Sequence, residues 1–199
     1  MKTRTVQDVS ALPTFGYGPA ASIWWGTAAF MMLEGTGFVL VAATYLYLAV
    51  VNPHWPPTGE PPGLLWSTLL TIALLASAWP NQLAKRSGER ADLPATRLNL
   101  VVMSAIGFLI LALRAMEFTT LNVRWDTNAY GSIVWVILGL HTTHIITDLG
   151  DTVVLAVLMF TAHGRGKRFS DVSDNAFYWY FVILTWLPLY LLLYFVPRL

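Results

Sequence analysis

Five long apolar stretches constrain the fold of this chain more than any other feature of its sequence. They cover about residues 23–51, 64–83, 98–118, 132–162 and 176–196. Lipid offers no partner to a free backbone amide or carbonyl, so a run of about 20 apolar residues crosses a bilayer as a helix. The sequence therefore predicts an all-α, polytopic membrane protein whose five transmembrane helices form a bundle.

The first 21 residues differ from the rest of the chain. They are polar, rich in proline and glycine, and lack the short apolar core and cleavage site of a signal peptide. We expect residues 1–21 to form a cytoplasmic amino-terminal tail. Residues 22–199 are then expected to form a single five-helix membrane domain.

Composition limits the chemistry available to the chain. Of its residues, 56% are apolar and 12% charged, against roughly 45–50% and 25% in a soluble domain. The net charge of +1 offers no general attraction to nucleic acid. The absence of cysteine excludes disulfides, thiolate zinc sites and iron–sulfur clusters. With only four histidines, two of them in loops, we expect no haem or metal site in this chain.

Basic residues are concentrated in the tail and connections that lie on one side of the membrane. They precede the first span and lie in the second and fourth connections: Lys2, Arg4, Lys85, Arg86, Arg90, Arg97, Arg165, Lys167 and Arg168. Cytoplasmic loops carry the excess of lysine and arginine, which places the amino terminus in the cytoplasm and the carboxyl terminus outside. Anionic lipid headgroups are the expected partners of Arg165, Lys167 and Arg168.

Glu34 is a lone carboxylate about a dozen residues into the first span. A charge within a span costs at least a few kcal/mol, so it requires a partner or a water-filled cavity. The functional interpretation is a proton-exchange or lipid-contact site. The structural alternative is a protonated side chain that forms a hydrogen bond across a helix interface.

The fourth span carries a second polar feature, formed by His141, His144, Asp148 and Asp151. Spacings of three, four and three place these residues on one stripe of a helix. They could hold or exchange protons, or contribute metal ligands. One helix alone cannot complete a metal's coordination shell, so the preferred interpretation is a buried polar seam without metal.

Arg114 and Glu117 lie three residues apart near the end of the third span. This spacing allows the two side chains to meet on one helix face. We expect a pair that neutralises itself within the membrane, and Glu117 is retained as a further candidate for proton or lipid contact.

Several motifs together resemble subunit III of haem–copper respiratory oxidases, in the form with five helices. The most specific is the run Trp55, Pro56, Pro57, Thr58 and Gly59 after the helix that contains Glu34. The segments 113–118, 130–132, 139–145 and 178–182 also resemble that family. The likeness covers nearly the whole chain beyond the tail.

This resemblance implies a non-catalytic subunit in a bacterial cell membrane, part of aerobic electron transport. It implies contact with the catalytic subunit I and with subunit II, which would hold the haem and copper. It also implies bound phospholipids in a cleft between helices, and support for proton uptake and assembly. In that family's pattern, Glu34 is the intramembrane glutamate.

The chain departs from the family pattern at several polar positions. Tyr180 stands in place of a histidine and Ile183 in place of an aspartate, while Asp148 and Thr142 replace glycines and Arg114 replaces a glutamine. These changes indicate a divergent branch with carboxylates moved from the fifth helix to the fourth.

Two other functions remain open from the sequence. One is an accessory subunit of a nitric oxide reductase, which would have the same fold. The other is a stand-alone membrane metalloprotein or proton-linked transporter built around the stripe on the fourth span.

Overall fold

A computed structural model describes residues 15–57, 60–164 and 166–198. Regular structure in these residues is helical, which confirms the predicted all-α fold class. The long helices are α1 (Ser22–Val51), α2 (Leu64–Glu89), α3 (Leu93–Phe118), α4 (Ala129–Met159) and α5 (Lys167–Tyr194), with short 3₁₀ turns η1 (Gly18–Ala20) and η2 (Val196–Arg198). All five long helices are long and apolar enough to cross a membrane.

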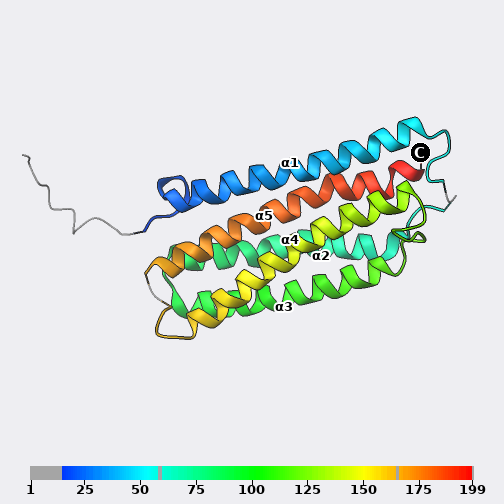
Figure 1. Ribbon diagram of the computed structural model, residues 1–199. Helices are drawn as coiled ribbons and strands as arrows, with labels where there is room; N and C mark the ends of the chain where they lie inside the picture. Colours follow the sequence, from blue (N-terminus) through cyan, green and yellow to red (C-terminus); the bar gives the residue numbers. More distant parts are fainter. Residues whose placement is uncertain (1–14, 58–59, 165, 199) are drawn as a thin grey trace, which may run out of the picture.

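The helices form one bundle in which α5 packs against α1, α2 and α4 (Figure 1). Helix α3 packs against α2 and α4, on the side of the bundle opposite α1. Helix α1 packs on α4 and α5. Only 11% of the most apolar stretch of α1 is buried, against 50% of the corresponding stretch of α4. Most of the surface of α1 is therefore left for lipid or for another protein.

Three helices extend beyond the apolar stretches at the end of the bundle where most basic residues lie. Helix α2 continues to Glu89, α3 begins at Leu93, and α5 begins at Lys167 rather than near residue 176. Hydropathy detects only the part of a helix that lies in hydrocarbon, so the polar turns outside it were missed. The fourth helix lies three residues earlier than its predicted span at both ends.

Local signals explain where α3 and α4 begin. Asp92 caps α3 by accepting a hydrogen bond from the backbone N of Ala95, and Pro94 lies in the first turn, where no backbone donor is needed. Asn128 caps α4 in the same way through the backbone N of Gly131. Gly131 also lies directly against the carbonyl oxygen of Arg124, where a Cβ atom would overlap it. The turn before α4 therefore requires glycine at this position.

Candidate functional site

A cleft of about 780 Å³ lies between α1, α4 and α5. Its apolar wall comes from residues such as Ile23, Phe30 and Leu158. Five carboxylates and two cations also line it: Glu34, Asp148, Asp151, Asp171, Asp174, Lys167 and Arg168. A surface of this kind can hold an amphiphile, with its chain on the apolar wall and its headgroup among the charges.

Glu34 lies at the inner part of this cleft, which is the end nearest the middle of α1. Its side chain contacts two other helices. Its Oε2 accepts a hydrogen bond of 2.7 Å from the hydroxyl of Tyr178 on α5. Its Oε1 lies 3.2 Å from Nε2 of His144 on α4, within ion-pair distance but without the alignment of a hydrogen bond. Glu34 thus links α1 to both helices on which it packs.

His144 is held from its other ring nitrogen. Nδ1 lies 2.7 Å from the carbonyl oxygen of Leu140, one turn earlier on α4. The ring also packs against Phe38 of α1, with 4.8 Å between the ring centroids. These contacts fix the imidazole so that Nε2 faces the carboxyl group of Glu34.

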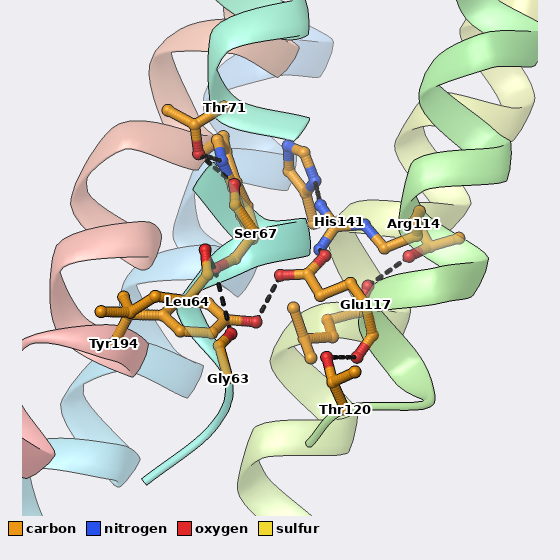
Figure 2. Close-up of polar contacts among 12 residues, drawn as sticks. Gly63, Leu64, Ser67, Thr71, Arg114, Glu117, Thr120, His141 and Tyr194 are labelled. Atoms are coloured by element: carbon orange, nitrogen blue, oxygen red, sulfur yellow. Dashed lines mark hydrogen bonds and ion pairs between the residues drawn. The ribbon is translucent and has the colours of Figure 1, made fainter. Parts of the chain in front are cut away.

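His141 lies on the same helix but belongs to a different cluster, which Figure 2 shows. Its Nδ1 lies 2.8 Å from Nη2 of Arg114, and its Nε2 lies 3.0 Å from the carbonyl oxygen of Val182. A carbonyl only accepts and a guanidinium only donates, so Nε2 carries the proton and Nδ1 accepts. This imidazole is neutral and joins α3, α4 and α5.

The predicted pair of Arg114 and Glu117 is confirmed within this cluster. Nη1 of Arg114 lies 2.5 Å from Oε2 of Glu117, and both side chains are almost completely buried. Tyr194 donates a further hydrogen bond to Oε1 of Glu117. The guanidinium carbon of Arg114 lies 4.1 Å from the ring centre of Trp186, a favourable cation–π arrangement.

Asp148 and Asp151 lie further along α4 and share one partner. Nδ2 of Asn175 on α5 lies 3.3 Å from Oδ1 of Asp148 and 3.2 Å from Oδ2 of Asp151. The amide oxygen of Asn175 accepts from Thr152, which fixes its orientation. Asn175 therefore holds both carboxylates along the cleft.

The predicted stripe on the fourth helix thus divides among three sets of partners. His141 contacts Arg114, His144 contacts Glu34, and the two aspartates contact Asn175. Both histidines are bonded to backbone carbonyls, as the polar-seam interpretation expects. Among the residues that the structure describes, no group of three or more histidines and carboxylates is placed to hold a metal ion.

The basic segment predicted between the fourth and fifth spans is largely helical. Lys167 and Arg168 lie in the first turn of α5, and Arg168 is paired with Asp171 at 2.9 Å. These two residues were predicted to lie in the connection before the fifth span, but they belong to α5, because the helix continues beyond the apolar stretch. Arg165 lies outside the described residues.

The family motif lies at the opposite end of the bundle. The ring of Trp55 packs edge-on against Tyr45 and Tyr130, with centroid distances of 5.3 and 4.9 Å. Pro56 is buried, whereas Pro57 is exposed. Thr58 and Gly59 lie outside the described residues. This end of α1 is therefore anchored by aromatic packing.

Sequence reasoning missed a set of hydrogen bonds between α2 and α5. Nε1 of Trp186 donates to Thr71 and Nε1 of Trp179 donates to Ser77, each at 2.8 Å. Nδ2 of Asn81 donates to the carbonyl oxygen of Ala176. The stretch over 64–83 lacks charge, so it contains no intramembrane ion that requires a partner. Its small polar residues at helical spacing were the signal.

Fold and site together define a helical integral membrane protein with a carboxylate-lined cleft. A family model described as cytochrome c oxidase subunit III matches residues 20–197. The chain therefore belongs to the cytochrome c oxidase subunit III family. This places it among membrane proteins of respiratory electron transport.

Individual relatives agree with the family. Cytochrome c oxidase subunit 3 of Thermostichus vulcanus is 26% identical over 176 residues, which cover 87% of either chain. The protein of the same name from Synechocystis sp. is 30% identical over 85% of this chain and 73% of its own length. A probable cytochrome c oxidase subunit 3 of Mycobacterium leprae is 25% identical, covering 88% of this chain and 86% of the relative.

Proposed function

We propose that this chain is the non-catalytic subunit III of a haem–copper terminal oxidase in a bacterial cell membrane. It carries no redox centre and binds the catalytic subunit I together with subunit II, which hold the haem and copper. Its work is to support proton uptake, to hold phospholipid and to aid assembly. The observation that carries this proposal is the carboxylate-lined cleft with Glu34 at its inner part, in a chain of this family.

The walls of the cleft suit a phospholipid. The apolar residues of α1 and α4 face the acyl chains, while Lys167 offers a cation to the phosphate. Arg168 also lines the cleft, although Asp171 already neutralises part of its charge. Lipid held there would cover part of α1, most of whose apolar surface is not buried by the rest of the bundle.

The carboxylates of the cleft support a role in proton uptake. Asp151 and Asp148 lie one turn apart on α4, and Glu34 faces the same cleft further in. Carboxylates within a span commonly mark a proton path. In the proposed function they collect protons near the catalytic subunit's entry path.

The charge distribution favours an orientation with the basic end in the cytoplasm. Lys85, Arg86 and Lys167 lie at that end of the bundle. At the other end, Arg124 is paired with Asp126 at 3.1 Å, so its charge is offset. We propose a cytoplasmic tail over residues 1–21 and a single membrane domain over 22–199, with the carboxyl terminus outside.

The family match favours an oxidase over the other two candidate functions. An accessory subunit of a nitric oxide reductase would have the same helices, so the partner decides between the two.

The experiment is purification of the tagged chain from its host in mild detergent. We expect co-purification of a subunit rich in intramembrane histidines, with the absorption spectrum of haem and with stoichiometric copper. Haem and non-haem iron without copper would instead identify a nitric oxide reductase. Purification of the chain alone, with bound metal or transport activity, would overturn the proposal.

A further inference from the structure

The contacts of His144 determine where its own proton lies. Nδ1 lies 2.7 Å from the carbonyl oxygen of Leu140, which has no hydrogen to donate. The hydrogen of this bond therefore belongs to Nδ1. In a neutral imidazole the other nitrogen, Nε2, then carries only a lone pair.

That lone pair faces an oxygen of Glu34. Nε2 and Oε1 are 3.2 Å apart, and Nε2 has no hydrogen-bond partner in the described part of the chain. Two bare acceptors at this distance repel each other. One additional proton, on either the carboxyl group or the imidazole, converts the repulsion into an attraction.

Burial also favours one additional proton on the pair formed by Glu34 and His144. The side chain of His144 is 8% exposed and that of Glu34 is 20% exposed. With one additional proton the pair has no net charge, either as carboxylic acid and imidazole or as carboxylate and imidazolium. Without it the pair carries one negative charge, which is costly in a membrane span.

The surroundings hold the pair together and leave one side open. The hydroxyl of Tyr178 on α5 donates to Oε2 of Glu34, and Phe38 of α1 packs on the imidazole. On α4, Asp148 lines the same cleft and shares the amide of Asn175 with Asp151. His141 is neutral, and the positive charge of Arg114 on α3 is offset by Glu117.

We propose that Glu34 and His144 form a single proton-binding site, in which one proton is shared by carboxyl and imidazole and exchanges with water through the cleft. On release, the proton passes to water on the open side of Glu34, and the pair changes from zero charge to one negative charge. This site would be part of the proton uptake described under the proposed function. The inference rests on the proposed function only for what the proton is used for.

Infrared difference spectroscopy of the intact complex in nanodiscs, recorded as the pH is raised, tests the proposal. Subtracting the Glu34→Gln spectra from the wild type isolates the bands that depend on Glu34. We expect bands of the Glu34 carboxyl and of the His144 ring to change together in one step, with loss of one proton. The proposal would be overturned if the two groups changed in separate steps. It would also be overturned if Glu34 were a carboxylate beside a neutral His144 at every pH.

Glu34→Gln is a suitable variant because it keeps both contacts. Its amide oxygen can accept from Tyr178 and its amide N–H can donate to Nε2 of His144. We expect the imidazole of this variant to remain neutral and the coupled step to be lost. A histidine that titrates as before in Glu34→Gln would contradict a shared proton.

Glu60→Gln is the matched control, since Glu60 is exposed in the connection between α1 and α2. It should remove an ordinary carboxylate signal and leave the coupled step in place. Failure of the proposed function would be seen separately, as purification without a haem-bearing partner.

Discussion

Arg114 of α3 donates a hydrogen bond from Nη2 to Nδ1 of His141 on α4, with 2.8 Å between the two nitrogens. The same imidazole donates to the carbonyl of Val182 on α5. One histidine thus fastens three helices in the interior of the bundle. Since both ring nitrogens are engaged, we interpret His141 as a structural residue.

Removal of one partner from the buried ion pair should be strongly destabilising. Glu117→Gln leaves the positive charge of Arg114 buried without a counter-charge, which costs about 3–5 kcal/mol. The effect is measured by heating the purified complex and recording the temperature at which this subunit is lost. The double variant Arg114→Gln, Glu117→Gln removes both charges and should recover most of the loss. A double variant no more stable than Glu117→Gln would contradict this view of the pair.

The hydrogen bond between Trp186 and Thr71 should contribute measurably to the packing of α2 on α5. Thr71→Val leaves Nε1 of the buried Trp186 without its acceptor, at a cost of about 1–3 kcal/mol. The matched control is Thr143→Val on the exposed face of α4, whose hydroxyl bonds only to its own helix. Subunit retention during heating in detergent compares the two variants. Equal effects would mean that the bond between helices adds nothing.

The fold could be predicted from the sequence because lipid requires internally bonded helices. Each of the five predicted spans corresponds to one observed helix. The ends of α5 and α2 could not be placed, because their polar turns lie beyond the hydrocarbon, where hydropathy carries no information. Capping residues were the better guide, as Asp92 at the start of α3 demonstrates.

The candidate site could be predicted only in part. Spacing alone placed Arg114 beside Glu117, because both lie on one helix. The partners of Glu34 and His144 come from other helices, and no periodicity within one segment indicates which helix lies opposite. Tyr178 and Asn175 were missed for that reason. Both lie on α5, which lines the cleft together with α1 and α4.

Gly131 should not tolerate any side chain. A Cβ atom there would overlap the carbonyl oxygen of Arg124, which is backbone and cannot rotate away. Gly131→Ala should therefore disturb the turn before α4 and reduce the yield of the assembled complex. Gly139→Ala is the control on the same helix, because nothing lies within 4 Å of its added Cβ. Equal yields of the two variants, compared with wild type, would show that the turn adapts.

A bulky residue at the cleft should displace bound phospholipid. Gly26 lines the cleft and nothing lies within 4 Å of an added Cβ atom, so the side chain of Gly26→Phe should extend into the cleft and fill part of its volume. Gly37→Phe on the same helix lies outside the cleft lining and serves as the control. Lipid phosphorus per complex is the measurement, and we expect it to fall only for Gly26→Phe. An equal fall in both variants would place the lipid elsewhere on α1.

Glu34→Gln should leave assembly intact and weaken sustained turnover of the complex at alkaline pH. The variant keeps the contact with Tyr178 but removes a group that can bind a proton. Free protons are scarcest at high pH, so the loss of a proton-collecting group should matter most there. Oxygen consumption followed over many turnovers, at neutral and alkaline pH, compares the variant with Glu60→Gln. If turnover and lipid content of Glu34→Gln both match the control, Glu34 serves only to join α1 to α4 and α5.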